Sequence, residues 1–447
     1  MRWFKRILIG LAVLVAVLVA MAVAIPFFVS LDDYIPRIEK AASDKLKEPV
    51  KIGKLRLSVV PVPHLVIDGI TVGKTEDVKV GKVTVTPELS SLFSPTRVIR
   101  SIEIGSLVVT QKGIDKIPVW SRQEARPGEP AVVRIASIRL DDALVKLDKT
   151  SFGPFDARVR LDEKGQPEEA SVTTQDGKLK AVIKPEKSGY AISASAKSWQ
   201  VPVGPPLVFD ELEIKGLATL TDANFSQINA KLYGGTAVGK ATVAWQKGLQ
   251  LKGNFALSQV ELKNLVPIIS PGTKMSGRLN AKPVFSAAAA DGAQLLSALH
   301  LETPFDVQNG VLHGVDIQKA AMNLLKQGSG GGETHFDQLS GHVVRDHLAY
   351  RFTGLNISSG ALSADGNVGI SPRHELSGRV NAKVNALGTS ATVALNVSGT
   401  VQSPTVLPTG GTMAGAAIGT AILPGIGTGV GAKAGQMIEG LFGKKPK

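Results

Sequence analysis

The chain contains no cysteine among its 447 residues. This absence excludes disulfide bonds, thiolate metal sites and cysteine nucleophiles. Aromatic residues make up only 5% of the sequence, which leaves few rings on which nucleic-acid bases could stack. The formal net charge of +13 is spread along the chain rather than gathered in one patch, so we expect no nucleic-acid partner. Such a charge suits a surface near anionic lipid head groups, and equally an ordinary basic surface in water.

The motifs of common enzyme classes are also missing. The sequence has no Walker loop, no Gly-x-Ser-x-Gly elbow and no His-Glu-x-x-His motif. Its one histidine cluster, His335, His342 and His347, lies near Asp337 and Asp346 without a recognised metal-ligand spacing. We therefore predict a protein that is not an enzyme and has no catalytic residues, no metal and no cofactor. Glycosidase chemistry by surface carboxylates stays open.

One long apolar run stands at the N-terminus. Residues 7–29 carry no charge, follow Arg2, Lys5 and Arg6, and are numerous enough to cross a bilayer as a helix. Because basic residues before such a segment stay in the cytoplasm, we predict a cytoplasmic stub (1–6) and a single-pass inner-membrane anchor (7–29). The bulk of the chain then lies in the periplasm. A cleaved signal peptide is the alternative, since Ala22-Val23-Ala24 resembles a cleavage site.

Beyond residue 30 the dominant pattern is an apolar–polar alternation of period two, which is typical of strands with one wet face. Turn signals such as Gln175-Asp176-Gly177 and Ala364-Asp365-Gly366 predict antiparallel meanders. We expect helices only at 34–47, 291–301 and 315–327. The predicted fold is mainly β: an elongated, curved antiparallel sheet with a few short helices. A second sheet, barrel closure or an open groove would each account for the apolar face.

Several segments resemble the AsmA family of bacterial membrane-anchored periplasmic proteins. The resemblance covers roughly residues 1–110 and 210–408, while the middle of the chain matches only as generic β-structure. It is carried by the order of these segments: Leu31-Asp32-Asp33-Tyr34-Ile35-Pro36, Val50-Lys51-Ile52-Gly53, Leu57-Ser58-Val59-Val60-Pro61-Val62-Pro63, Leu65-Val66-Ile67-Asp68-Gly69-Ile70-Thr71-Val72-Gly73, Ala230-Lys231-Leu232-Tyr233-Gly234-Gly235, Asn309-Gly310-Val311-Leu312-His313-Gly314-Val315-Asp316, Thr334-His335-Phe336-Asp337-Gln338-Leu339-Ser340-Gly341 and Val397-Ser398-Gly399-Thr400-Val401-Gln402-Ser403-Pro404.

This resemblance implies an N-terminal AsmA-like β region (30–272) and a C-terminal one with short helices (273–408). It also implies a repeating β-groove that serves phospholipid traffic between membranes or maintenance of the outer membrane. The partners would then be the inner membrane, phospholipid acyl chains and an outer-membrane or envelope component. An interaction scaffold for outer-membrane protein assembly, without lipid cargo, is the alternative. The apolar side chains that we predict to line a groove, with ordinary core as their other interpretation, are Phe155, Val159, Leu161, Leu249, Leu251, Phe255, Val393 and Leu395.

The C-terminal residues, 409–447, form a glycine-rich apolar tail. Glycines recur at every fourth residue, a spacing that lets apolar helices approach closely in membranes. We expect either a hairpin that inserts in a membrane or self-associates, or a flexible low-complexity tail. The glycines concerned are Gly411, Gly415, Gly419, Gly427, Gly431 and Gly435.

Overall fold

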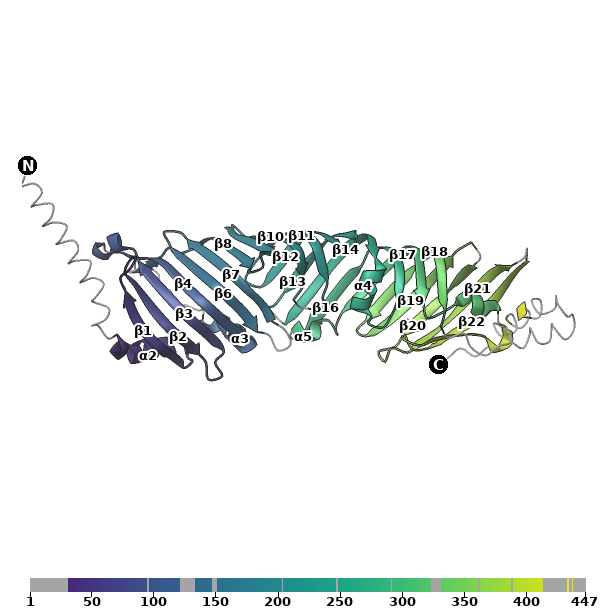
Figure 1. Cartoon of the computed structure of the whole chain (residues 1–447), viewed down its shortest axis with the longest axis horizontal. Helices are drawn as coiled ribbons and strands as arrows, with labels where there is room; N and C mark the ends of the chain where they lie inside the picture. Colours follow the sequence, from purple (N-terminus) through teal and green to yellow (C-terminus); the bar gives the residue numbers. More distant parts are fainter. Residues whose placement is uncertain are drawn as a thin grey trace, which may run out of the picture. The chain divides into compact units, whose positions relative to one another are not determined.

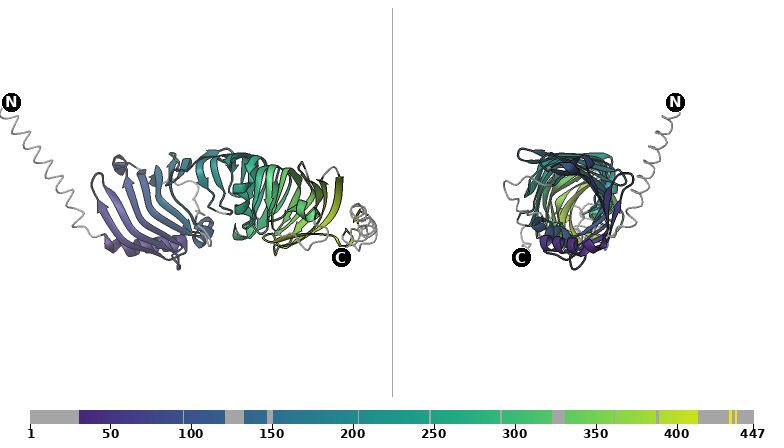
Figure 2. Two further views of the ribbon diagram at one scale, coloured as in Figure 1. Left: turned by 45° about the vertical axis from the view of Figure 1, so that its right-hand side comes forward. Right: turned by 90° about the vertical axis from the view of Figure 1, so that its left-hand side faces the viewer.

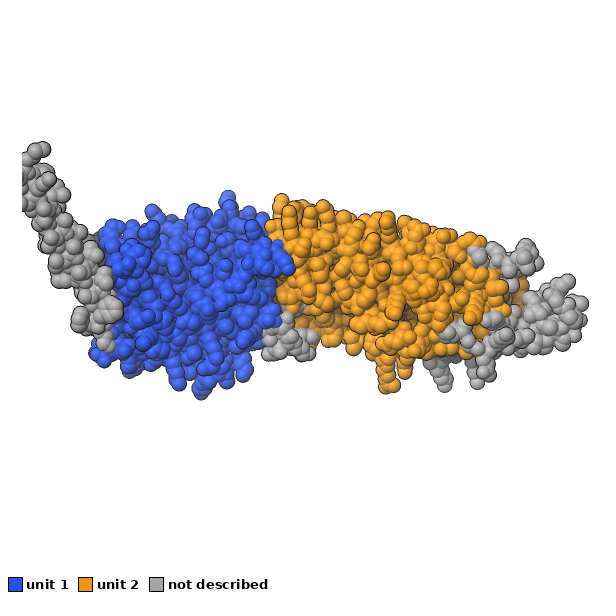
Figure 3. Space-filling view, in the orientation of Figure 1, with its two compact units in different colours: residues 1–194 blue, residues 195–447 orange. Residues whose placement is uncertain are grey.

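The computed structural model describes residues 31–94, 96–120, 133–146, 151–202, 204–246, 248–290, 292–322, 331–360, 362–386, 389–412, 432–433 and 436. The chain divides into two compact units, residues 1–194 (unit 1) and 195–447 (unit 2), which Figure 3 shows in blue and orange. Both units are mainly β, and their strand pairs are antiparallel except where β4 meets β5 and β6. The predicted mainly β, antiparallel fold class is therefore confirmed.

Unit 1 is one sheet in which β1, β2, β3, β4, β6, β7, β8 and β9 follow each other as neighbours, with β5 beside the start of β4. Figure 1 shows these strands side by side, and Figure 2 shows that they are bent. The bounds are η1 Asp32–Tyr34, α2 Ile35–Leu46, β1 Val50–Ser58, β2 His64–Val72, β3 Val78–Pro87, η2 Leu89–Phe93, β4 Arg97–Thr110, α3 Gln111–Trp120, β5 Val133–Ile135, β6 Ser137–Lys146, β7 Ser151–Leu161, β8 Pro167–Thr174 and β9 Leu179–Glu186.

Unit 2 continues with antiparallel strands after β10 (Gly189–Gln200), which contains the division between the units. The first half of β14 pairs with β16 and its second half with β15, and both of these pair with β17. The bounds are β11 Val208–Ala218, β12 Asp222–Leu232, β13 Gly235–Ala244, β14 Leu249–Glu261, α4 Leu262–Ile269, β15 Met275–Ala281, β16 Val284–Ala289, α5 Gly292–Leu295, β17 His300–His313, α6 Ile317–Met322, β18 Glu333–Asp346, β19 Ala349–Ser358, β20 Leu362–Ile370, β21 Leu376–Ala386, β22 Thr389–Gly399 and β23 Pro404–Pro408.

The helices differ in part from the prediction. Helix α2 lies within the predicted 34–47, whereas α5 is a single turn because β17 already begins at His300. Helices α3 and α4 were not predicted, and each contains a proline. The predicted turn at 364–366 was wrong: these residues lie inside β20, where a Cβ on Gly366 would meet the carbonyl oxygen of Arg379.

The predicted anchor, residues 7–29, lies outside the described residues, as does the cytoplasmic stub. Among the residues that the structure does describe, no helix has the length and apolar character needed to span a bilayer. The predicted boundary between residues 272 and 273 falls inside unit 2, between α4 and β15.

Candidate functional site: the apolar face of the unit 1 sheet

The strand register of unit 1 places apolar side chains directly opposite each other across the whole sheet. We call two such rows the open rows. Each runs through β1, β2, β3, β4, β6, β7, β8 and β9. The first consists of Leu57, Leu65, Val85, Ile102, Ile138, Val159, Ala170 and Ile183, and the second of Leu55, Ile67, Val83, Ile104, Leu140, Ala157, Val172 and Ala181.

The open rows are not packed like a protein core. Every member of the first row is half-buried, and in the second row only Leu55 is fully buried. Among the described helical segments, α2 packs mainly on β1, while η2 and α3 pack mainly on β4, with α3 also approaching the start of β3 at Val78. A face covered by a second layer would bury these side chains almost completely. The described part of unit 1 therefore presents an apolar face that water reaches.

The opposite face of the same strands is mainly polar. One cross-strand row on this face has two apolar members, Val66, which is buried, and Val182, and six polar ones. The polar members are Arg56, Thr84, Glu103, Arg139, Arg158 and Ser171. Arg139 donates a hydrogen bond of 2.8 Å to Asp141, and this bond, followed by the negative charge of the carboxylate, raises the pKa of the Arg139 guanidinium. The sheet is thus amphipathic from face to face, as the period-two pattern predicts.

Unit 2 contains a comparable apolar row that is closed. The closed row consists of eight directly paired residues, and all of them except Leu279 are buried. Helix α4 contributes buried Leu262, Leu265 and Val266 to this core, and α6 contributes Ile317. The closed row is Val260, Leu279, Val307, Leu339, Ile357, Ala364, Ala382 and Val393.

The eight predicted groove residues fall into three groups. In unit 1, Phe155, Val159 and Leu161 are half-buried and lie on the apolar face of β7. In unit 2, Leu249, Leu251 and Phe255 are half-buried on β14, where the Phe255 ring stacks on Phe285 with centroids 5.9 Å apart. Val393 and Leu395 are 2% and 0% exposed and belong to the closed core.

Val393 and Leu395 leave no room for a guest, so we do not include them in the proposed lining. The sequence did not distinguish them from Val159 because all three follow the same alternation. The other open-row residues were missed as site residues, although their alternation was visible in the sequence.

Five of the six predicted tail glycines, Gly415, Gly419, Gly427, Gly431 and Gly435, lie outside the described residues. Gly411 is described and follows Thr409, which is fully buried and whose backbone N–H donates to Ala394 of β22 at 2.9 Å. Gln436 donates to the Thr392 carbonyl oxygen at 3.5 Å. The described tail residues thus lie on the last strands of unit 2.

The three histidines of the sequence cluster lie near three different carboxylates. His335 lies 3.5 Å from Glu333, His342 lies 3.2 Å from Glu302, and His347 lies 3.1 Å from Asp346. Two of these carboxylates have a second histidine nearby, since His313 lies 2.8 Å from Glu333 and His300 lies 3.6 Å from Asp346. In the described ranges, no three His, Asp or Glu side chains converge in a way that could hold a metal ion.

A buried carboxylate fixes α3 to the end of the sheet in unit 1. Asp77, only 2% exposed, accepts from Lys116 at 2.8 Å and from Thr75 at 2.6 Å, and Lys116 also pairs with Glu48 at 2.6 Å. The hydrogen bond from Lys116 is the largest cause that lowers the pKa of Asp77, followed by that from Thr75. Gly113 allows the close approach, since a Cβ there would lie 2.6 Å from the Asp77 carbonyl oxygen.

This cluster predicts acid sensitivity of unit 1. Because the folded-state pKa of Asp77 is lowered, its contribution to stability is full above the unfolded-state pKa of about 3.9 and is lost as the pH falls through the folded value. We expect Asp77→Asn to lower stability at neutral pH and to flatten the loss of stability on acidification. Urea unfolding at several pH values measures this slope. An unchanged slope in the variant would contradict the assignment.

Comparisons with known proteins add no further information about the site. No family model, no curated protein and no solved structure matches the chain. The functional argument therefore depends on the geometry described above.

Proposed function

We propose that unit 1 binds the hydrocarbon chains of phospholipids along its open rows. The protein would serve phospholipid transport between membranes or maintenance of the outer membrane. The observation that carries the proposal is that two rows of apolar residues cross eight strands without a polar interruption and, apart from Leu55, stay half-buried. The AsmA-like segments of the sequence support the same function.

The dimensions suit an acyl chain. Eight strands about 4.8 Å apart make a row about 34 Å long. The hydrocarbon core of a bilayer is about 30 Å thick, so one row has room for a chain from a single leaflet, which spans about half of that distance. Burying each CH₂ group is worth about 0.8 kcal/mol, so an uncovered chain in water is strongly disfavoured and a continuous apolar row removes most of that cost.

The uniform lining would favour movement over tight binding. The open rows consist of Val, Ile, Leu and Ala, with no charged or hydrogen-bonding side chain that would hold an acyl chain at one strand. A chain displaced by one strand meets the same chemistry, so its free energy changes little. The closed row of unit 2 would not take part, because α4 and α6 already fill that face.

In this proposal the protein performs no covalent chemistry and needs no cofactor. The segment 7–29 holds it in the inner membrane as a single-pass anchor, and the bulk of the chain lies in the periplasm. Its partners are the inner membrane, phospholipid acyl chains and an acceptor at the outer membrane or in the envelope.

An interaction scaffold without lipid cargo is the second candidate, acting in the assembly or targeting of outer-membrane proteins. It is favoured by the packed core of unit 2, which resembles that of an ordinary binding domain. The two candidates differ in whether the open rows are occupied by lipid.

Mass spectrometry of an organic extract of the purified full chain separates these candidates. The protein is extracted without detergent in polymer discs and washed extensively. We expect it to retain more phospholipid than an unrelated single-pass protein prepared in the same way. An extract with no excess phospholipid would contradict lipid binding and favour the scaffold.

A further inference from the structure

Four successive connections along one edge of the unit 2 sheet carry exposed large apolar side chains. These connections are the β11–β12 turn, the β13–β14 turn, the β16–β17 connection and the β18–β19 turn. They share an edge because Ala244 pairs with Gln250, Leu249 with Ala289 and His300 with Asp346. We call this edge the apolar edge. Its exposed side chains are Leu220 at 86%, Trp245 at 43%, Leu296 at 43% and Leu348 at 51%.

Several polar groups of the first two connections are hydrogen-bonded within these turns. The indole N–H of Trp245 donates to the Leu220 carbonyl oxygen at 2.9 Å, and the Trp245 backbone N–H donates to Thr221 at 3.0 Å. Thr219 accepts from the backbone N–H groups of Thr221 and Asp222. The hydroxyl of Thr221 donates to Asp222 at 2.9 Å. These two turns can therefore move from water into an apolar environment without breaking these hydrogen bonds, whereas unpaired polar groups would oppose that transfer.

In the other two connections, hydrogen bonds from Arg345 satisfy backbone carbonyl groups. Arg345 donates to the Leu296 carbonyl oxygen at 2.8 Å and to the His347 carbonyl oxygen at 2.7 Å. One guanidinium thus satisfies one backbone carbonyl in each of these connections. The β18–β19 turn also carries the exposed Asp346 and His347, which lie 3.1 Å apart and stay in the polar layer beside Leu348.

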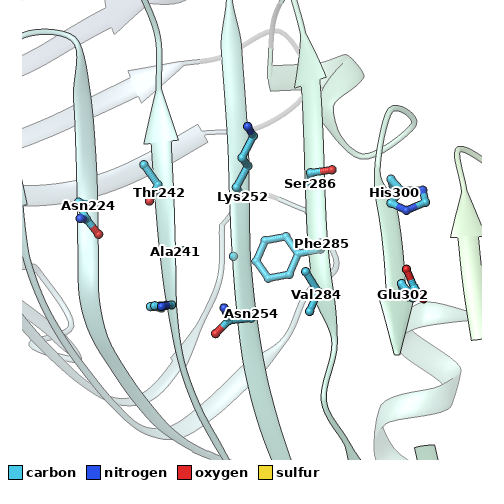
Figure 4. A pocket seen from close by; sticks show the side chains of 12 residues that line it. Asn224, Ala241, Thr242, Lys252, Asn254, Val284, Phe285, Ser286, His300 and Glu302 are labelled. Carbon is cyan, nitrogen blue, oxygen red and sulfur yellow. The ribbon is translucent and has the colours of Figure 1, made fainter. Parts of the chain in front are cut away.

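Two lysines lie behind the apolar edge, on the face of β13 and β14 that carries their polar side chains. They line a hollow of about 500 Å³ together with Thr242, Asn254, Ser286 and one carboxylate, Glu302, among others. Figure 4 shows Lys252 and Glu302 on different strands of this hollow. The lysines are Lys240 and Lys252. The register places Thr242, Lys252 and Ser286 in one row. Within the described part of the chain, neither lysine forms an ion pair with a carboxylate. Lys252 is four residues from the turn at Gly248, or about 13 Å along an extended strand.

We propose that the apolar edge of unit 2 docks on the surface of an anionic phospholipid bilayer. Leu220 and Trp245 enter the boundary between head groups and acyl chains, a depth of about 5–10 Å for interfacial segments. Lys252 then lies close to the head groups, where a cation is attracted by anionic lipid. Lys240 pairs with Asn254 and lies about 7 Å further back, which is still within a Debye length of about 10 Å. Trp is enriched at this boundary in membrane proteins. The inference does not rest on lipid binding by the open rows of unit 1.

A fluorophore at position 220, in the β11–β12 turn, tests the proposal. The chain has no cysteine, so a single introduced cysteine can be labelled specifically. The full-length Leu220→Cys variant, labelled with a nitrobenzoxadiazole dye, is mixed with vesicles of phosphatidylethanolamine and phosphatidylglycerol that contain doxyl-labelled phospholipid. We expect the dye to be quenched about twofold or more, because it lies about 5–10 Å inside the interface. The matched control is Thr236→Cys, an exposed position at the β12–β13 end of the same sheet, which should stay unquenched.

The lysines provide a second readout. In the labelled background, Lys240→Glu with Lys252→Glu should weaken quenching by vesicles that contain phosphatidylglycerol and change little with phosphatidylcholine alone. Equal quenching of the two labelled positions, or none at position 220, would overturn the proposal. A blue shift of the dye without doxyl quenching would also overturn it, since that result indicates a protein partner at the apolar edge. Lipid extraction from the same preparations reports separately on the open rows.

Discussion

Replacing Val159 with aspartate is expected to remove most of the phospholipid that copurifies with the protein, while unit 1 stays folded. Val159 lies in the middle of the first open row, between Ile138 and Ala170. Water already reaches this half-buried position, so the free protein can solvate the new carboxylate. A hydrocarbon chain laid over it would desolvate the charge, which costs several kcal/mol, and 1.4 kcal/mol is already a tenfold loss in affinity. We therefore expect at least a roughly tenfold loss of bound lipid.

Arg158→Asp provides the matched control for this experiment. Arg158 is the neighbouring residue on the same strand, it is exposed on the polar face, and its replacement changes the charge by more than the Val159 substitution does. The lipid content of this variant should remain close to that of the parent protein. Equal lipid content in the two variants would show that the apolar face is not the binding surface. Circular dichroism of both proteins checks that the sheet is intact.

Truncating one leucine in each unit should have very different effects on stability. Leu395 is fully buried and pairs with Val380 and Pro408, so Leu395→Ala should destabilise unit 2 by about 3–5 kcal/mol, the range for closed cores. Leu161 is half-buried on the open face, where little cavity is created. We expect Leu161→Ala to lower the unfolding free energy of unit 1 by about 1 kcal/mol, because full burial of the three lost carbon groups would be worth about 2.4 kcal/mol and this side chain is only half-buried.

Amide hydrogen exchange with peptide resolution measures the two stabilities separately, because exchange in β22 and β7 reports on each unit. Comparable losses at the two sites would contradict the distinction between an open and a closed face. A large loss at Leu161 would indicate that an additional layer covers the unit 1 sheet.

The strand alternation was predictable from the sequence because it depends on local geometry. The structure confirms that β7 and β14 each have one apolar side. On β7 this side carries Phe155, Val159 and Leu161. On β14 it carries Leu249, Leu251 and Phe255. Register was not predictable. It makes Val159 the partner of Ile138 and Ala170, and it is set by bulges and turn lengths across many strands.

The difference between an open and a closed face was not predictable either. Val393 has the same alternation as Val159 in the sequence, but it belongs to a core that α4 and α6 complete, and α6 contacts its strand, β22. Helix α4 was missed because Pro267 argues against a helix, and α3 because it contains Gly113 and Pro118. In α4, burial of Leu265 and Val266 offsets the cost of a proline inside the helix. In α3, the Lys116–Asp77 hydrogen bond holds the helix in place. Tertiary contacts thus override local propensity at both sites.

Photo-crosslinking in living cells tests the central claim most directly. Benzoylphenylalanine at Val159, at Arg158 on the opposite face, and at Leu339 in the closed row would each be irradiated, and lipid adducts quantified by mass spectrometry after purification. Phospholipid adducts at Val159, with none above background at Arg158 and Leu339, are the predicted result. No adduct at Val159, or equal adducts at all three positions, would contradict lipid binding along the open rows.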